Sequence, residues 1–177
     1  MPDTQRRVRP TRRGEFEIRL PRDELEVLRS LPAQLREILP TEDPAVGRLF
    51  PPGYADDPEA SAEYRRLVRD DLLEGHLEAL RVMEATLDAR RLTEDQLVSW
   101  LRAVNDLRLV LGTKLDVTEE TYEREIPEDH PDAPGLALYF YLGWLEEQIV
   151  EALAGGLDPA GTEPGGGSDQ APPVDRS

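Results

Sequence analysis

The side chains of this sequence that could take part in metal binding or catalysis are two histidines and many carboxylates. The chain contains no cysteine, which excludes disulfides, thiolate metal sites and thiol nucleophiles. His130 lies in the acidic segment EREIPEDHPD, whose composition suits a hard cation but whose spacing differs from that of a calcium-binding EF-hand loop. We therefore predict a solvated acidic loop around His130, and no metal site.

His76, the other histidine, lies in a segment where apolar residues recur every three or four positions. A lone histidine in such a segment is usually a core residue whose hydrogen bonds are satisfied, and we predict this role. The alternative is a metal-dependent enzyme that uses His76 or His130 with neighbouring carboxylates. The sequence contains no phosphate-binding loop, GxGxxG turn, GxSxG elbow or HExxH helix. We therefore predict neither an enzyme nor a cofactor.

Arg108 and Asn105 form a polar pair on an otherwise apolar helix face. This helix is predicted to begin after Thr93, which has the side chain of an N-cap and is followed by two acids. Arg108 falls in the centre of the apolar stripe, with Asn105 beside it, and a buried arginine needs a partner. The alternative is a site for an anion or a protein, lined by Asn105 and Arg108. The predicted partners of Arg108 are acids of the preceding long helix: Asp70, Asp71 or Glu74.

The last predicted helix, residues 135–154, has two apolar faces. One is a regular stripe of aliphatic residues. Such a helix is either enclosed by its own domain or part of an interface with a homodimer mate or another protein, and both interpretations stay open. The second face supplies the candidate partner-binding residues, with a glycine that allows close approach: Leu136, Phe140, Gly143 and Trp144.

The charge of the chain is strongly uneven. The formal net charge is −16, yet residues 1–13 carry five arginines and one aspartate. An acidic body repels the phosphate backbone, which disfavours direct DNA binding. We predict that the basic segment is a flexible, solvated arm. The alternative is an arm that reaches a nucleic-acid groove or an acidic protein surface through five arginines: Arg6, Arg7, Arg9, Arg12 and Arg13.

Hydrophobic periodicity predicts a mainly all-α fold, a single domain of four or more helices with one short N-terminal strand. The strand is residues 14–20, which could pair with a symmetry mate in a dimer. Pro32 should separate two short helices, and the proline-rich segment 40–57 should be a packed loop. A long helix should follow from residue 58 to about residue 90. Three residues give the loop apolar groups to bury: Leu49, Phe50 and Tyr54.

The helical domain is predicted to span residues 14–154, between the basic arm of residues 1–13 and a disordered, Gly/Pro-rich tail of residues 155–177. The Arg-rich N-terminus continues into GEFEIRLPRDELEVL instead of an apolar segment. No run approaches the roughly 18 apolar residues that a membrane span requires. We therefore predict a cytoplasmic protein with no membrane partner.

Three stretches of the sequence resemble one known family: RLFPPGYADDPEASAEYRRLVRDDL, WLRAVNDLRLVLGTKLDVTEE and LALYFYLGWLEEQIVEAL. This is the family of actinobacterial AosR-like oxidative-stress transcriptional regulators, formerly labelled only a domain of unknown function and often encoded beside the ClpS adaptor. The likeness covers about residues 14–154. Its most specific part is the block around Asn105, Asp106 and Arg108.

The resemblance implies a non-enzymatic cytoplasmic regulator that binds an alternative sigma factor under oxidative stress and so redirects RNA polymerase. An acidic helical domain with aromatic side chains suits such a contact. The intramolecular disulfide proposed for such a regulator cannot form here, because the chain has no cysteine. The gene neighbourhood of the family implies a second hypothesis, which is a binding or adaptor module in Clp-dependent proteolysis.

Overall fold

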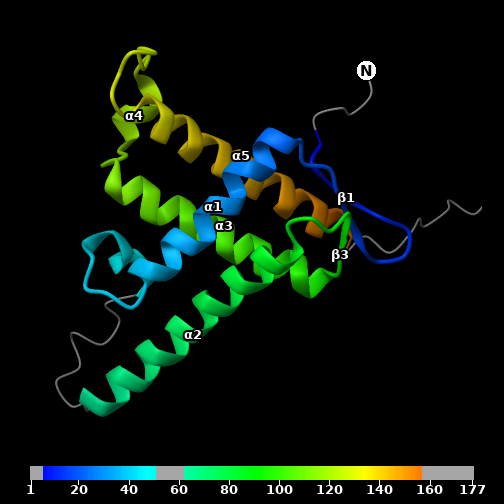
Figure 1. The fold of residues 1–177 in the computed structure, drawn as a ribbon, viewed down its shortest axis with the longest axis horizontal. Coiled ribbons are helices and arrows are strands. Elements are labelled where there is room, and N and C mark those ends of the chain that lie inside the picture. Colours follow the sequence, from blue (N-terminus) through cyan, green and yellow to red (C-terminus); the bar gives the residue numbers. More distant parts are fainter. Residues whose placement is uncertain (1–5, 51–61, 157–177) are drawn as a thin grey trace, which may run out of the picture.

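The computed structural model describes residues 6–50 and 62–156, which form a mainly α-helical domain with a small sheet at one end (Figure 1). The predicted all-α class is confirmed. The elements follow one another in this order: β1 (Val8–Pro10), β2 (Phe16–Ile18), α1 (Arg22–Ile38), the 3-10 helix η1 (Pro44–Leu49), α2 (Ala62–Thr86), β3 (Arg91–Leu92), α3 (Glu94–Lys114), α4 (Glu119–Glu123) and α5 (Ala133–Gly156).

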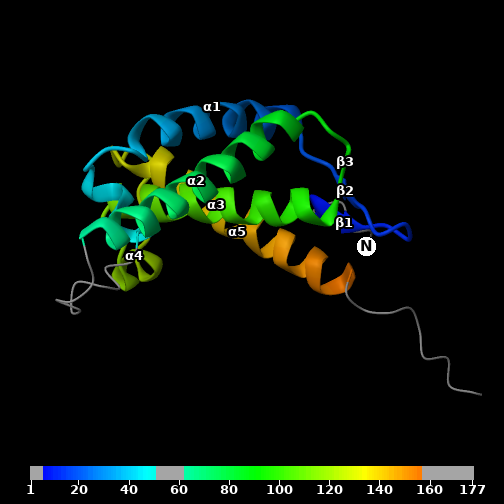
Figure 2. The same ribbon diagram turned by 90° about the horizontal axis from the view of Figure 1, so that it is seen from below.

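Helix α3 is the centre of the domain, with α5 on one side and α1 and α2 on the other (Figure 2). It begins where the sequence predicted, because Thr93 caps it. The Thr93 hydroxyl accepts a hydrogen bond from the Gln96 N–H at 3.2 Å, and the Gln96 Oε1 accepts one from the Thr93 N–H at 3.0 Å. This reciprocal pair satisfies two donors that a helix start leaves open.

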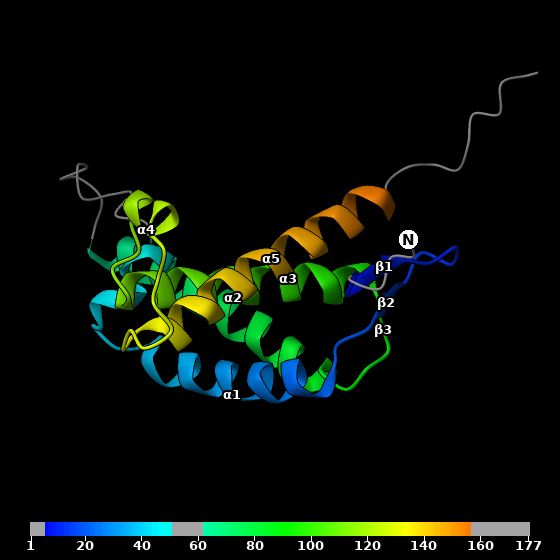
Figure 3. The same cartoon turned by 90° about the horizontal axis from the view of Figure 1, so that it is seen from above.

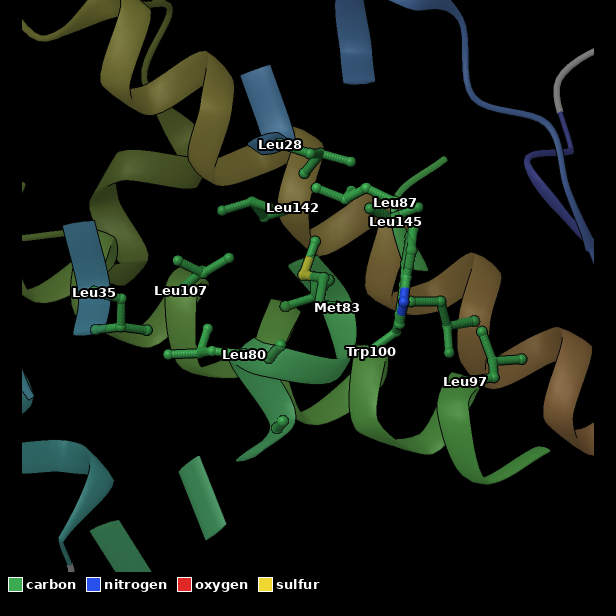
Figure 4. Packing of buried hydrophobic residues seen from close by; sticks show 14 of the residues in the cluster. Leu28, Leu35, Leu80, Met83, Leu87, Leu97, Trp100, Leu107, Leu142 and Leu145 are labelled. Carbon is green, nitrogen blue, oxygen red and sulfur yellow. The ribbon is translucent and has the colours of Figure 1, made fainter. Parts of the chain in front are cut away.

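The core lies between α1, α2, α3 and α5, where their apolar faces meet. Met83 of α2, Trp100 of α3 and Leu145 of α5 are completely buried and converge in Figure 4. The indole N–H of Trp100 donates to the Thr86 hydroxyl at 2.8 Å, so the one polar atom of this side chain is satisfied. Helix α3 packs against α2 along one flank and against α5 along another, so both flanks are buried.

The N-terminal sheet has the order β1-β2-β3, and both of its strand pairs are antiparallel. The predicted strand exists as β2, with Phe16 and Ile18 buried. Pairing with a symmetry mate was a wrong prediction, because β1 and β3 of the same chain occupy the two edges of β2. The flexible-arm prediction is also wrong for Val8–Pro10, which form β1. The sheet and α4 lie at opposite ends of the molecule (Figure 3).

Pro32 does not divide the first helical segment, contrary to the sequence prediction. Helix α1 continues through it, and Pro32 is buried on the same face as Leu28 and Leu35. A proline inside a helix removes one backbone hydrogen bond. Burial of this apolar face offsets that loss, so the helix stays continuous, and tertiary packing prevails over local propensity.

The other predicted segments agree in part with the structure. The proline-rich loop contains η1 and buries Leu49 and Phe50 as predicted, whereas Tyr54 lies outside the described residues. Helix α5 extends two residues beyond the predicted end, and residues 157–177 of the predicted tail also lie outside the description. No helix in the described part of the chain is long and apolar enough to cross a membrane.

Candidate functional site

Three aromatic residues of α4 and α5, namely Tyr122, Tyr139 and Phe140, form what we call the aromatic cluster. The Phe140 ring packs edge-on against Tyr122, with centroids 5.3 Å apart, and against Tyr139, with centroids 5.5 Å apart. Tyr122 is 57% exposed and Phe140 is 37% exposed, whereas Tyr139 is buried at 9%. The cluster thus has a buried base and an exposed aromatic surface at the α4 end of the molecule.

Two contacts position the residues of the aromatic cluster, one at the start of α4 and one between α5 and α3. Thr118 and Thr121 form a turn that starts α4, because the Thr118 N–H donates to the Thr121 hydroxyl at 3.0 Å. On the other side, the Tyr139 ring lies directly over Gly112 of α3. A Cβ atom at Gly112 would stand only 2.8 Å from Tyr139 Cε2, so only glycine leaves room for the ring in this position.

Arg108 lies beneath the aromatic cluster and forms a salt bridge with Glu146 of α5, with Nη1 and Oε2 3.1 Å apart. The predicted partner on α2 is therefore wrong. Since α3 is buried on two flanks, the helical wheel could not tell which flank faces α2, and Arg108 lies on the α5 side. Its guanidinium stands 5.3 Å from the Tyr139 ring centroid, and its Nε is buried beside Gly143 without a hydrogen-bond partner.

The charge of Arg108 affects the acidity of the neighbouring tyrosines. Burial opposes the charged form of Arg108, but Tyr122, Tyr139 and Glu146 together outweigh it and raise the arginine's pKa. The hydrogen bond from Tyr139, and then Arg108, lower the pKa of the Tyr122 hydroxyl. Burial, and then the bond to Tyr122, raise the pKa of Tyr139. Tyr122 is therefore the more acidic member of the pair.

The four candidate partner-binding residues of the last helix do not share one surface. Phe140 is exposed, but Leu136 is buried and Gly143 faces Arg108. Trp144 is half-buried, because Arg7 of the N-terminal segment lies over its ring at 5.5 Å from the centroid. The face predicted to need an outside partner is thus partly covered by the chain's own N-terminal hairpin, which consists of β1, β2 and the residues that flank them.

A three-residue network ties that hairpin to the helices. Arg7 forms a salt bridge with Glu24 of α1 at 2.7 Å, and the Tyr141 hydroxyl of α5 donates to the same carboxylate at 2.8 Å. Burial, followed by the contact with Glu24, raises the pKa of Tyr141. Arg7 therefore has a structural role, although the sequence analysis placed it in a flexible, solvated arm, with nucleic-acid binding as the alternative. The remaining arginines of that arm divide into half-buried and exposed side chains: Arg9 is half-buried, and Arg6, Arg12 and Arg13 are exposed.

His76 is a satisfied core residue, as predicted. It is buried, with Nδ1 2.6 Å from Asp106 Oδ2 and Nε2 3.1 Å from the Leu49 carbonyl oxygen, so it joins α2 to α3 and η1. The sequence analysis named Asp106 only as part of the family-specific block and did not predict its burial, at 2% exposure, or its contact with His76. The sequence singled out its neighbour Asn105, which is half-buried. Ala103 and Val110, three and four residues from Asp106, mark the second apolar flank that could have located it.

His130 lies exposed in the loop before α5, where its Nδ1 accepts a hydrogen bond from the Asp132 N–H at 3.1 Å. This agrees with the predicted solvated loop. Nowhere in residues 6–50 and 62–156 do three histidine, aspartate or glutamate side chains gather in a way that could hold a metal ion.

The fold and the cluster define a mainly α-helical domain with an exposed aromatic surface at one end. Residues 5–153 match the family described as domain of unknown function (DUF2017), and the chain belongs to that family. The putative oxidative stress regulator AosR of Mycobacterium leprae (strain TN) is 33% identical over 158 residues, which is 79% of this chain and 71% of that protein. The resemblance to AosR-like proteins is confirmed.

A second relative is the oxidative stress regulator AosR of Mycobacterium tuberculosis (strain ATCC 25618 / H37Rv). It is 32% identical over 130 residues, which is 64% of this chain and 59% of that protein. No solved structure matches the chain. Both relatives are named as regulators of oxidative stress, which supports a regulatory role for the family to which this chain belongs.

Proposed function

We propose that this protein is a non-enzymatic cytoplasmic regulator of transcription that acts in oxidative stress by binding a sigma factor or RNA polymerase. The observation that carries the proposal is the exposed part of the aromatic cluster, Tyr122 and Phe140, in a chain whose relatives are named oxidative stress regulators. Exposed aromatic side chains on a rigid base are typical anchors of protein interfaces. Direct DNA contact is a weaker alternative, since the net charge is −16.

The surroundings of the aromatic cluster indicate what kind of protein surface would fit it. The rings supply an apolar centre, and the acidic residues Glu119, Glu120 and Glu123 lie on α4 beside Tyr122. A complementary partner would insert an apolar side chain between Tyr122 and Phe140 and place basic residues around it. A basic protein surface is thus a better match than a second acidic chain, which makes homodimerisation through this surface the less favoured alternative.

The test is a single substitution, Phe140→Ala, because Trp144 also anchors the N-terminal hairpin and its removal would disturb the fold. A tagged chain is used to capture proteins from its native cytoplasm, with and without peroxide, and mass spectrometry identifies them. We expect a sigma factor or RNA polymerase with the wild type. Loss of a central aromatic anchor costs about 2 kcal/mol or more, so we expect binding about thirtyfold weaker in the variant.

Val150→Ala is the matched control, because Val150 is 49% exposed on the same helix but is not part of the aromatic cluster. It should bind like the wild type. If Phe140→Ala also binds like the wild type, the cluster is not the contact surface. Recovery of ClpS or a Clp unfoldase in place of polymerase would instead favour the adaptor function in proteolysis.

A further inference from the structure

Within residues 6–50 and 62–156, the exposed side chains that one-electron oxidants attack most readily are aromatic. The sequence has no cysteine and two methionines, of which Met83 is completely buried and Met1 lies outside the described residues. Trp100 is also completely buried. Trp144 is half-buried under Arg7. Tyr64 and Tyr122 are exposed, at 49% and 57%, so these two tyrosines are the phenols of the described residues that are most open to an oxidant.

Tyr122 contacts a second tyrosine, Tyr139. Its hydroxyl oxygen lies 2.8 Å from that of Tyr139, and the ring centroids are 6.3 Å apart with an angle of 68° between the ring planes. The contact brings together the hydroxyl-bearing edges of the two rings, where the ortho carbons also lie. One member is open to solvent and the other is buried against Gly112, so an oxidant reaches the pair from the Tyr122 side.

The groups around the pair favour loss of the Tyr122 proton, which must leave when the phenol is oxidised to a phenoxyl radical. The hydrogen bond from Tyr139 and the nearby Arg108 guanidinium stabilise the phenolate form and lower the pKa of Tyr122. A phenolate is a better electron donor than a neutral phenol. The Tyr139 hydroxyl, which keeps its proton more strongly, can donate a hydrogen bond to the Tyr122 oxygen throughout this step.

We propose that Tyr122 and Tyr139 form an oxidative modification site, at which one-electron oxidants such as carbonate and nitrogen dioxide radicals couple the two rings into an intramolecular dityrosine. Each phenol loses one electron to an oxidant radical and one proton to water. The two phenoxyl radicals join through their ortho carbons, and the ring hydrogens at those carbons move to the oxygens to restore two phenols. In total two hydrogen atoms are lost, and two oxidant radicals are each reduced by one electron.

The cross-link would fix the short helix α4 to α5 directly beside Phe140. Its regulatory meaning rests on the proposed function, since it changes the surface assigned to partner binding, whereas the coupling reaction itself does not depend on a partner. A chain without cysteine would thereby acquire a covalent response to oxidants at its contact surface.

The experiment treats the purified full-length chain, at a dilution that disfavours contacts between molecules, with peroxynitrite in bicarbonate buffer. This mixture supplies both radicals. Dityrosine is followed by its fluorescence and located by mass spectrometry after trypsin digestion. Cleavage after Lys114 and Arg124 separates residues 115–124, which contain Tyr122, from residues 125–176, which contain Tyr139. We expect these two peptides to be joined, with a mass lower by two hydrogen atoms than their sum.

Two variants that keep the aromatic rings, Tyr122→Phe and Tyr139→Phe, should each reduce the cross-link to background. Tyr64→Phe, which alters another exposed tyrosine among the described residues, should leave the cross-link unchanged. Circular dichroism of each variant confirms that the helices persist. The proposal is overturned if the cross-link persists in Tyr122→Phe, if it forms equally in urea-unfolded chain, or if the wild type is only nitrated.

The two proposals fail separately. Absence of coupling in the purified chain would remove the modification site but would leave the effect of Phe140→Ala on partner binding unaffected. Conversely, if Phe140→Ala binds partners normally while the wild-type chain still forms the Tyr122–Tyr139 cross-link, the contact surface is wrong and the modification site stands.

Discussion

Gly112 determines where the Tyr139 ring can lie, and with it the geometry of the aromatic cluster. An alanine Cβ at this position would stand 2.8 Å from Tyr139 Cε2, well inside van der Waals contact. We expect Gly112→Ala to displace the ring and to lower the free energy of unfolding by about 1–3 kcal/mol, as overpacking of a core usually does. Urea denaturation measures this change.

Gly47 provides the control for that experiment, because a Cβ there would meet no atom within 4 Å. Gly47→Ala should leave stability nearly unchanged or raise it slightly, by restricting the unfolded chain. Equal stability of the two alanine variants would show that Tyr139 has room to move, and that the glycine is not needed for the cluster.

Single residues were also where sequence reasoning was least complete. Phe140 could be identified, because helical spacing places it off the main apolar stripe of its helix. Tyr122 could not, because it reaches the cluster from a segment that read only as an acidic loop. Arg108 was correctly expected to need an acid. Its partner Glu146 was missed, because a pattern along one helix does not show which neighbour each flank faces.

At the scale of elements, the contact of Tyr141 with Glu24 connects α5 to α1 and supports the N-terminal hairpin. Tyr141→Phe removes the hydroxyl that donates to Glu24 at 2.8 Å. We expect a loss of about 1 kcal/mol, typical of one intramolecular hydrogen bond. Because Arg7 shares this carboxylate, amide hydrogen exchange in β1 should also become faster. Exchange as slow as in the wild type would show that the hairpin is held by other contacts.

The elements themselves were predictable to different degrees. Helix α3 followed from a capping pattern at Thr93 and a repeated apolar spacing, both of which are local. Strands β1 and β3 were missed because each is two or three residues long and exists only through pairing with β2. The prediction at Pro32 was wrong for a different reason. The proline is a local signal for a helix break, but burial of its helix face keeps α1 continuous.

At the scale of the whole molecule, the net charge of −16 predicts that the protein does not bind duplex DNA on its own. Arg12 and Arg13 are exposed in the turn between β1 and β2, and they are the arginines to test. Deleting residues 1–13 would also remove β1 and the Arg7 contacts, so the informative variant is Arg12→Ser with Arg13→Ser. Fluorescence anisotropy with labelled duplex should show no difference between the variant and the wild type.

The salt dependence of DNA binding is a second test of the same prediction. DNA contacts made by arginine weaken steeply as salt increases, because counterions must be displaced from the phosphates. Binding by the wild type that declines with salt, and that the double variant loses, would contradict the prediction and assign a DNA contact to the turn.

The N-terminal hairpin contacts the last helix, α5, and this affects the order in which the chain can fold during synthesis. The backbone N–H of Arg7 donates to Gln148, which is 141 positions later in the sequence. At a ribosomal rate of roughly 5–20 residues per second, β1 waits on the order of ten seconds for α5 to be synthesised. Strand β1 is synthesised before every helix of the domain, yet it is among the last elements to reach its native contacts. A nascent chain that terminates before α5 leaves Val8 and Phe16 uncovered, as a substrate for chaperones and proteases.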